Sequence, residues 1–510
     1  MLLLIKNSMR KNVTEYLDIT EGLYSEKIAV EDANGCITFG EMKRNALKIA
    51  EFCVEQNIFK QPVCVYLPKS KEMVTSFVGT NYSGNFYVPL DIKSPDTRIR
   101  NILATLNPGL IITDEEHKDQ VENFGLPTVT VGCLCSRKEA DLSVVESARS
   151  RQIDTDPEYS IFTSGSTGIP KGVVISHRGV IDYIDWAVDT FHFTADAKIG
   201  NQAPFYFDNS IFDIYSCLLT GAKMVIIPET LFMFPVKLPE FVRDNDITTI
   251  FWVPTVMINV ANSGVLSEIE LPKLKNVVFC GEVMPNTQLN IWRKAQPQCT
   301  YANLYGPTEI SDVCTYYIVD RPFKDSDSLP IGKACENMRI IILNEKNEIA
   351  KTNEQGEICV IGTGVSLGYW NNPEITQKAF IQNPVNPYYE ERIYRTGDLA
   401  YVNDEGLIIY LGRMDNQVKV KGNRIELGEI ENAAMCVGGV KGACAVFDEK
   451  NQKIVLFIES CEAFRLRKLN LELKKYIPNY MLPGDLVVME KFPHTANDKI
   501  DRVTLKKSLG

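Results

Sequence analysis

A loop rich in hydroxyl groups and glycine carries the strongest chemical signal in this sequence. Residues 163–172 read TSGSTGIPKG, with four hydroxyl side chains and three glycines in ten positions. The N–H groups and hydroxyls of such a loop can approach phosphate oxygens closely, and Lys171 adds positive charge. Apolar segments flank the loop at 161–162 and 173–175, where a flexible linker is uncommon. We therefore predict a polyphosphate-binding loop between two strands. The expected phosphate contacts are Thr163, Ser164, Gly165, Ser166, Thr167, Gly168 and Lys171.

Two other kinds of loop are excluded by individual residues. A Walker loop, GxxxxGK[ST], would need glycine where Pro170 stands and serine or threonine where Gly172 stands. A nucleophile elbow would need Ser166 inside a GxSxG frame, which is missing. The sequence therefore argues against a P-loop nucleotidase and against a serine hydrolase.

Further motifs stand in a fixed order around this loop. The segment 87–91 precedes it, and the others follow at 207–210 (FDNS), 280–282 (CGE), 303–309 (NLYGPTE), 356–359 (GEIC), 394–399 (YRTGDL), 412–431, 478–483 and 497–502 (NDKIDR). With this ordered set, nearly the whole chain resembles the adenylate-forming superfamily, which includes acyl-CoA synthetases, firefly luciferase and the adenylation domains of nonribosomal peptide synthetases. The resemblance implies that the chain uses ATP to convert a carboxylic acid into an acyl-AMP.

The chemistry of that reaction explains which residues the resemblance makes catalytic. In-line attack of a carboxylate on the α-phosphorus builds charge on the phosphoryl oxygens, so the site needs a metal ion and cationic donors. By resemblance, Glu309 ligates Mg²⁺, Thr308 contacts the α-phosphate, and Lys499 bridges substrate and phosphate oxygens. Asp498 replaces the glycine that the family usually carries before this lysine, and aspartate can still adopt a left-handed turn conformation.

The resemblance also implies contacts to the nucleoside. Asp398 accepts from the ribose hydroxyls with Arg413 nearby, and Tyr305 stacks on or flanks the adenine. Taken alone, Asp398 would equally suit a plain turn after Thr396 and Gly397. The full set of nucleotide contacts outside the loop is Asn303, Tyr305, Gly306, Thr308, Asp398 and Arg413.

Asp208 indicates that the acid is an amino acid. It matches the aspartate that pairs with the substrate α-ammonium in amino-acid-activating members, whereas aryl- and fatty-acid-activating members lack this carboxylate. A buried carboxylate needs a cationic partner, and the substrate amine can supply it. The implied substrate-binding residues are Asp208, Asn209, Phe212, Phe251, Val278, Cys280, Gly281, Leu304, Asp312 and Val313.

The size of the predicted pocket favours a small or medium side chain, because Phe212, Phe251 and Leu304 take up volume. Asp312 is unusual at its position, and either bonds a substrate hydroxyl or amine or caps the local backbone. Residues 279–283 resemble D-alanine:carrier-protein ligases, in which the cysteine equivalent to Cys280 helps to favour the D-enantiomer. D-alanine is therefore the leading single candidate, although Asp312 and both phenylalanines are hard to justify for a methyl side chain.

The acceptor is expected to be a phosphopantetheine thiol on a separate carrier protein, because the chain ends about a dozen residues after Lys499 and contains no Gly-Gly-x-Ser site. The alternative is an acyl-CoA synthetase that uses CoA as the thiol. A luciferase-like oxygenase would need a luciferin pocket, which we do not recognise. An inactive binding protein would usually have lost Lys499, Glu309 or Asp398.

The elements that position these residues form an α/β fold. Apolar runs at 63–67, 223–227 and 277–280 alternate with amphipathic stretches, which favours buried, largely parallel strands with crossover helices. We predict a large body of several subdomains with mixed, largely parallel sheets at 1–413, and a small, mobile α+β domain at 414–510. A strand is expected near 417–421 and a helix near 469–476. Asp415 matches the hinge about which the small domain of the family rotates.

Composition limits the other function classes. The net charge of −11 argues against nucleic acid or an anionic membrane as the main partner. Four histidines, namely His117, His177, His192 and His494, are too few for a site built on several imidazoles. Fourteen cysteines without a CxxC pair read as buried thiols of a reducing cytoplasm. The apolar residues 1–5 are too few for a membrane span.

Overall fold

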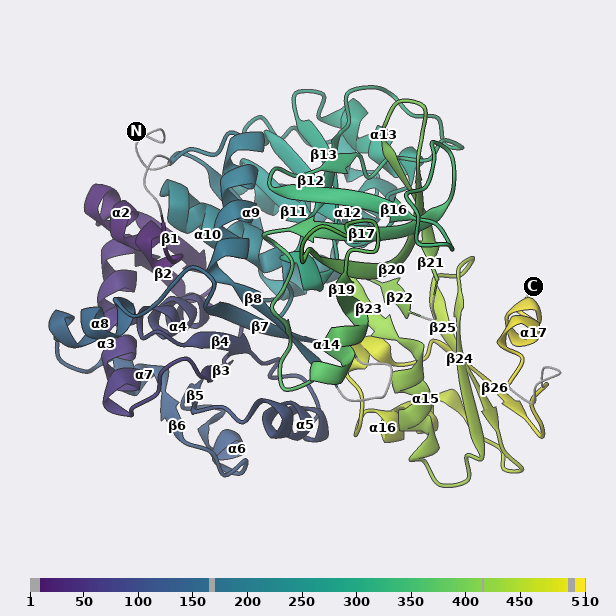
Figure 1. Ribbon diagram of the computed structural model, residues 1–510, viewed down its shortest axis with the longest axis horizontal. Helices are drawn as coiled ribbons and strands as arrows, with labels where there is room; N and C mark the ends of the chain where they lie inside the picture. The colour runs from purple at the N-terminus through teal and green to yellow at the C-terminus, as the bar shows by residue number, and fades with distance from the viewer. Residues whose placement is uncertain (1–9, 165–169, 415–416, 494–499, 510) are drawn as a thin grey trace. The chain divides into compact units, whose positions relative to one another are not determined.

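The computed structural model describes residues 10–164, 170–414, 417–493 and 500–509 (Figure 1). Strands and helices alternate along most of this chain, which divides into two compact units. The first unit comprises Met1–Asp91, Asn107–Ile161 and Val173–Gly412, and the second comprises Ile92–Leu106, Phe162–Gly172 and Arg413–Gly510. Each unit is therefore assembled from three segments of the sequence.

A nine-stranded sheet in the first unit has the order β15-β14-β13-β12-β11-β9-β10-β1-β2. The strands from β1 through β10, β9, β11 and β12 to β13 run parallel, and antiparallel strands complete both edges. Every residue of β12 is buried, as expected for a parallel strand covered on both faces. The bounds are β1 Ile28–Asp32, β2 Gly35–Thr38, β9 Lys198–Asn201, β10 Lys223–Ile226, β11 Thr249–Trp252, β12 Asn276–Cys280, β13 Thr300–Tyr305, β14 Thr315–Ile318 and β15 Lys333–Ala334.

Two further sheets contain the remaining strands of this unit. A seven-stranded sheet has the order β18-β8-β7-β4-β3-β5-β6, and a five-stranded sheet has the order β16-β17-β20-β19 with β21 also paired to β20. The bounds in the seven-stranded sheet are β3 Pro62–Tyr66, β4 Phe86–Pro89, β5 Leu110–Thr113, β6 Thr128–Thr130, β7 Pro157–Thr163, β8 Lys171–Ser176 and β18 Gly368–Tyr369. In the five-stranded sheet they are β16 Met338–Leu343, β17 Gly356–Gly362, β19 Phe380–Gln382, β20 Arg392–Val402 and β21 Ile408–Arg413.

Most helices of this unit connect strands, and several begin at capping side chains. Thr38 and Glu41 form a reciprocal capping box at α3, and Ser176 accepts from the Gly179 N–H at the start of α9. The α-helices are α2 Thr14–Tyr24, α3 Phe39–Glu55, α4 Lys71–Tyr82, α6 Lys118–Glu122, α7 Val131–Cys135, α8 Leu142–Arg149, α9 His177–Thr190, α10 Asn209–Thr220, α11 Lys237–Asp244, α12 Pro254–Asn262, α13 Asn286–Ala295 and α14 Pro373–Ala379. Short 3₁₀ helices occur at η1 Glu229–Met233, η2 Val265–Ser267 and η3 Thr308–Ile310.

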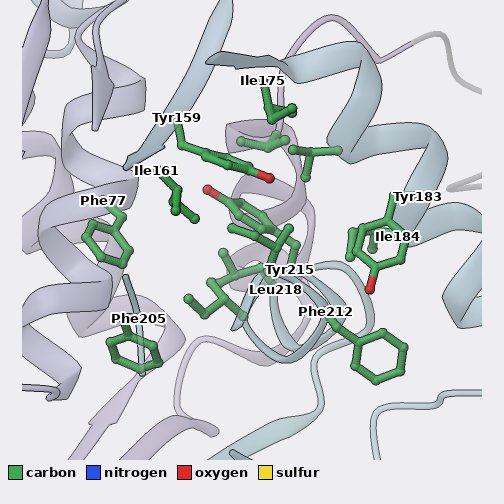
Figure 2. Close-up of a cluster of buried hydrophobic side chains, with 14 of the residues drawn as sticks. Phe77, Tyr159, Ile161, Ile175, Tyr183, Ile184, Phe205, Phe212, Tyr215 and Leu218 are labelled. Carbon is green, nitrogen blue, oxygen red and sulfur yellow. The ribbon is translucent and has the colours of Figure 1, made fainter. Parts of the chain in front are cut away.

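A large apolar core joins the two larger sheets through helices α4, α9 and α10. It contains Ile161 of β7, Val278 of β12 and Phe212 of α10. Figure 2 shows Tyr159 and Tyr215 reaching into this core from β7 and α10. The opposite face of the nine-stranded sheet packs in a separate cluster with α12 and α13, which includes Trp252 and Trp292. Alternate residues of β11 and β12 therefore enter different cores, and one of these cores contains the predicted substrate residues.

The second unit has its own core and a smaller α+β arrangement. A hairpin, β22 Gln417–Val420 and β23 Asn423–Glu426, precedes a three-stranded sheet of β24 Gly442–Asp448, β25 Lys453–Glu459 and β26 Asp485–Met489. The helices are α5 Asp96–Leu106, α15 Leu427–Met435, α16 Leu466–Leu473, α17 Arg502–Lys507 and the 3₁₀ turn η4 Asn479–Met481. Ile425, Leu456 and Leu473 are among the side chains buried in this core. The segments 92–106 and 162–172 pack in this unit although they are distant from it in sequence.

The predicted fold class, an α/β body with largely parallel sheets, is confirmed. The apolar runs chosen from the sequence form β3, β10 and β12, and the predicted C-terminal helix begins three residues earlier, at Leu466, and ends at Leu473. All fourteen cysteines are free thiols, but Cys36, Cys133, Cys436 and Cys461 are exposed, so the expectation of buried thiols was wrong for these four. Nowhere in the described chain is a helix both long and apolar enough to cross a membrane. The movement of a lid at 414–510 stays a prediction.

Candidate active site

The carboxyl ends of adjacent parallel strands bring four predicted substrate residues together. Phe251 of β11 pairs in register with Val278 of β12, and Cys280 pairs with Leu304 of β13. Residues paired in register share a face, and positions two apart on a strand do so as well. These four side chains therefore form one buried apolar surface at the edge of the sheet where ligands bind in open α/β folds.

Helix α10 adds the next part of this surface. The Phe212 ring is fully buried, and its centroid lies 4.8 Å from the centroid of the Phe251 ring. Phe191 and Phe193 also contact Phe212, with ring centroids 5.7 Å and 5.6 Å away. Val313 is buried in the same core. The apolar members of the predicted substrate set thus lie together, and Phe212 is held firmly by its neighbours.

Asp208 stands directly before α10, half-buried, and its carboxylate accepts from the Asn209 N–H at 3.2 Å. Burial raises the pKa of Tyr159 well above its usual value, and the charges of Asp208 and Asp312 raise it further. Charges act strongly on one another only over short distances in a low-dielectric interior. The charges of both aspartates thus influence the same buried tyrosine.

Asp312 has a partner that the sequence did not indicate. The Tyr183 hydroxyl of α9 donates to Asp312 Oδ2 at 2.6 Å, and the residues are 4% and 2% exposed, respectively. Asp312 and the preceding Ser311 both have left-handed backbone angles, with φ of 75° and 61°. Consecutive left-handed residues other than glycine cost conformational energy and tend to mark functional sites. Substrate contact and backbone cap both stay predictions for Asp312.

Glu309 lies in η3 and is fully buried. Its Oε1 atom accepts from the Tyr369 hydroxyl of β18 at 2.8 Å, and its backbone carbonyl accepts from the Ser366 N–H at 2.9 Å. Thr308 is 9% exposed and begins the same 3₁₀ turn. The turn thus presents a fixed carboxylate next to a hydroxyl.

The residues fit Mg²⁺ that arrives with a nucleotide better than a resident metal. No group of three or more His, Cys, Asp or Glu side chains in the described part of the chain could hold a metal ion. Mg²⁺ usually binds through one or two carboxylates together with substrate phosphates and waters. Glu309 supplies one carboxylate of that kind. Its role as the Mg²⁺ ligand stays a prediction.

Asp398 is held by two tyrosines. Tyr305 donates to Asp398 Oδ2 at 2.6 Å, and Tyr410 donates to Asp398 Oδ1 at 3.4 Å. Burial raises the pKa of Tyr305 well above its usual value, and the neighbouring Asp398 carboxylate raises it further. Asp398 is therefore more than a turn residue, because its side chain sits in a buried hydrogen-bond arrangement with 6% exposure. Its role toward ribose stays a prediction.

Three of the predicted positions have mainly structural roles. Asn303 donates from Nδ2 to the Pro330 carbonyl at 2.8 Å, so this amide supports the backbone. At Gly306, an added Cβ atom would lie 2.1 Å from the Asp312 carbonyl oxygen. Gly281 has space around it but a φ of 101°, which favours glycine. Gly306 is thus required because the Asp312 backbone approaches it closely, and Gly281 because of its backbone conformation.

The phosphate loop is only partly described. Thr163 ends β7, and its hydroxyl is buried with no hydrogen-bond partner among the described residues. The Ser164 hydroxyl donates to the Arg424 carbonyl at 3.0 Å and accepts from the Glu426 N–H at 3.2 Å. Lys171 begins β8, and Arg413 ends β21. A buried hydroxyl without a partner among the described residues is what a phosphate-binding position offers.

Several predicted residues lie outside the described part of the chain, so their geometry is not on view. These are Gly165, Ser166, Thr167, Gly168, Asp415 and Lys499. Sequence reasoning, in turn, missed Tyr183, Tyr369 and Tyr410, whose hydroxyls contact predicted site carboxylates. No motif contains these tyrosines, because their importance comes from contacts between distant segments.

Comparisons with known proteins classify the chain. The family model described as AMP-binding enzyme matches residues 20–370. Tyrocidine synthase 1 of Brevibacillus parabrevis is 30% identical over 98% of this chain, but the chain covers only 45% of that protein. D-alanine–D-alanyl carrier protein ligase of Bacillus cereus is 32% identical over 92% of this chain and 94% of its own length.

Among solved structures, the Vibrio cholerae adenylation domain AlmE in complex with glycyl-adenosine-5′-phosphate superposes with a TM-score of 0.84. It covers 99% of this chain and 98% of its own length at 23% identity, so this likeness supports the fold alone. The family match and the relatives at 30–32% identity decide the classification. The chain belongs to the AMP-binding enzyme family of adenylate-forming ligases.

Proposed function

We propose that the enzyme activates a small amino acid as its aminoacyl-AMP, releases pyrophosphate, and transfers the aminoacyl group to the phosphopantetheine thiol of a separate carrier protein. The observation that carries the amino-acid assignment is the position of Asp208 before α10, next to an apolar cluster formed by Phe212 and the strand ends. A carboxylate in such surroundings is stabilised by a cation. The α-ammonium group of an amino acid supplies that cation.

The proposed roles follow the order of the reaction. The phosphate loop and Lys171 hold the phosphates, Asp398 with Arg413 holds the ribose, and Glu309 with Thr308 faces the α-phosphate. Bound Mg²⁺ would stabilise the charge that develops on the phosphoryl oxygens. Lys499 would hold the attacking carboxylate against the phosphate. Rotation of the small domain at Asp415 would then remove this lysine from the site and let the phosphopantetheine thiol enter in its place. One site would thus carry out both steps.

D-alanine is the first candidate for the amino acid, and a carrier protein is the candidate acceptor. A relative that this chain covers over 94% of its length is named D-alanine–D-alanyl carrier protein ligase, and Cys280 stands at the strand end where the predicted side-chain contact is expected. The free thiols suit a reducing compartment, so we place the reaction in the cytoplasm.

Amino-acid-dependent ATP/pyrophosphate exchange tests this proposal. The panel comprises the common L-amino acids, D-alanine, D-serine, β-alanine, and several fatty and aryl acids. We expect exchange with one small amino acid, and we expect Asp208→Asn to raise its KM strongly while the exposed control Asp119→Asn does not. Exchange only with acids that lack an α-amine, followed by thioester formation with CoA, would overturn the proposal in favour of an acyl-CoA synthetase.

A further inference from the structure

The loop at 202–208 connects β9 to α10 in the first unit and carries Asp208 at its end. Within the loop, the Phe207 N–H donates to the Pro204 carbonyl at 3.0 Å. The Phe207 carbonyl in turn accepts from the Ser210 N–H at 3.1 Å. These hydrogen bonds shape the chain on either side of Phe207. Contacts at the base of the loop then decide where the loop as a whole, and with it Asp208, is held.

A buried hydrogen bond closes this loop at its base. Asn201, the last residue of β9, donates from Nδ2 to Asp213 Oδ2 of α10 at 2.8 Å, across 12 positions of the sequence. Both side chains are fully buried, and a hydrogen bond in a low-dielectric interior is stronger than one in water. Because Asp208 lies between the two partners in sequence, this contact holds both ends of the segment that carries it.

Lys69 reaches the same place from the other large sheet, since it stands between β3 and α4. Its Nζ atom donates to the carbonyl oxygen of Gln202 at 2.9 Å and to that of Asn201 at 3.4 Å. The same atom lies 5.7 Å from the centroid of the Phe205 ring. That ring packs edge-on against Phe77 of α4, with centroids 6.1 Å apart (Figure 2). Lys69 thus contacts both the start and the middle of the loop.

The charge of Lys69 also acts on Asp213. Burial raises the pKa of Asp213 to about 7 from an ordinary value of 3.8, whereas the Asn201 hydrogen bond and the Lys69 charge lower it. Asp213 Oδ1 is buried and has no hydrogen-bond partner among the described residues. A carboxylate in such surroundings depends on the few donors and cations near it. Lys69, Asn201 and Asp213 therefore form one polar cluster, which we call the loop clamp.

We propose that the three residues of the loop clamp are positioning residues, which set the loop at 202–208 so that the Asp208 carboxylate meets the α-ammonium group of the amino acid. The inference rests on the proposed function and deepens it, because it gives a role to Lys69, Asn201 and Asp213, which lie in none of the sequence motifs. The clamp acts through Asp208. A displacement of that carboxylate by a fraction of an ångström weakens its close contact with the amine.

Two ligands of the same shape measure how much the amine contributes to binding. One is the amino acid that supports exchange in the panel above, and the other is its 2-hydroxy analogue, used as a competitive inhibitor. For the first candidate these are D-alanine and D-lactate. The inhibition constant of the hydroxy acid divided by the KM of the amino acid is the amine ratio. A general loosening of the fold weakens both ligands, whereas a displaced Asp208 lowers the amine ratio.

Lys69→Met should lower the amine ratio about tenfold and leave the KM for ATP unchanged. Lys69→Arg should restore part of the ratio, because a guanidinium group also donates to carbonyl oxygens. Lys198→Met is the matched control, since Lys198 lies at the other end of β9 and donates to the Asn245 carbonyl at 3.2 Å. In an Asp208→Asn background, Lys69→Met should have almost no further effect on the ratio, because its influence passes through Asp208.

An unchanged amine ratio in Lys69→Met would overturn the inference, and so would an equal loss with and without the Asp208→Asn change. If Lys69→Met does not fold, Asn201→Ala decides by the same ratio. This variant removes the hydrogen bond to Asp213 but keeps the carbonyl oxygen that Lys69 contacts. Its amine ratio should also fall about tenfold, and an unchanged value would overturn the inference. Failure of the proposed function looks different, because the unaltered enzyme would then support exchange with no amino acid.

Discussion

Tyrosine hydroxyls donate to three of the predicted site carboxylates. Tyr183 donates to Asp312, Tyr305 donates to Asp398, and Tyr369 donates to Glu309, at 2.6, 2.6 and 2.8 Å. A hydrogen bond to a charged acceptor is strong, and a neutral phenol provides it without cancelling the charge. Each carboxylate is thus oriented by a hydrogen bond from a neutral group.

Tyr369→Phe tests this principle at the carboxylate predicted to bind Mg²⁺. Removal of the hydroxyl frees Glu309 to rotate, and a hydrogen bond to a charged group contributes about 1.5–3 kcal/mol. We expect the Mg²⁺ concentration for half-maximal pyrophosphate exchange to rise roughly tenfold or more. The amino-acid preference should not change. A Mg²⁺ titration checks the result, and an unchanged midpoint would show that Tyr369 does not position Glu309.

At the scale of elements, a buried polar contact ties two helices to a strand. Glu158 of β7 accepts from Tyr215 of α10 and, at 2.7 Å, from Asn81 of α4. Burial raises the pKa of Glu158 to about 8 from an ordinary value of 4.5, although these two hydrogen bonds lower it in part. The folded protein therefore keeps this proton at pH values where the unfolded chain has lost it.

Glu158→Gln should remove a pH dependence of stability. The stability that Glu158 contributes is fully present below about pH 4.5 and is lost as the pH rises to about 8. Relative to the variant, the unaltered protein should lose up to about 1.4 kcal/mol of unfolding free energy per pH unit across this interval. Urea unfolding at several pH values measures the difference, with the exposed Glu345→Gln as control. Parallel pH profiles for the unaltered protein and Glu158→Gln would contradict the assignment.

The turn after β13 provides a second prediction at this scale. Gly306→Ala would place a methyl group 2.1 Å from the Asp312 carbonyl, so the Ser311–Asp312 turn must shift. We expect a lower melting temperature and a loss of exchange activity of at least tenfold, because the site needs its side chains held to within a fraction of an ångström. Gly22→Ala in helix α2, where nothing lies within 4 Å of the added Cβ, should be neutral or stabilising. Equal melting temperatures would show that the turn adapts.

Sequence patterns predicted the elements better than the contacts between them. Apolar residues dominate the runs that form β3, β10 and β12, so their burial is visible locally. The substrate residues at the strand ends, from Phe251 to Leu304, were predicted from the family resemblance. Tyr183 could not be chosen in this way, because its partner Asp312 is 129 positions away and both depend on tertiary packing. The same reason explains why α5 was not assigned to the second unit.

At the scale of the molecule, the second unit depends on contacts between segments far apart in sequence. Arg98 of α5 forms an ion pair with Glu429 of α15, and their side chains are 6% and 4% exposed. Thr97 of α5 also donates to the Lys475 carbonyl at 2.5 Å. Ser164 joins the phosphate-loop segment to the β22–β23 hairpin through Arg424 and Glu426. These contacts make the unit one packed body, although 331 residues separate Arg98 from Glu429.

Breaking the Arg98–Glu429 pair should therefore loosen the second unit selectively. Removal of one partner from a buried ion pair costs about 3–5 kcal/mol, because the other charge stays buried without compensation. Arg98→Met and Glu429→Gln should each increase hydrogen exchange in α5 and α15, while β11 and β12 of the first unit keep their protection. The double variant should cost less than the sum of the single variants, since neither charge then remains. Arg243→Met, at an exposed surface pair with Asp244, is the control. Additive effects in the double variant, or equal loosening of β11 and β12, would show that this pair does not hold the second unit together.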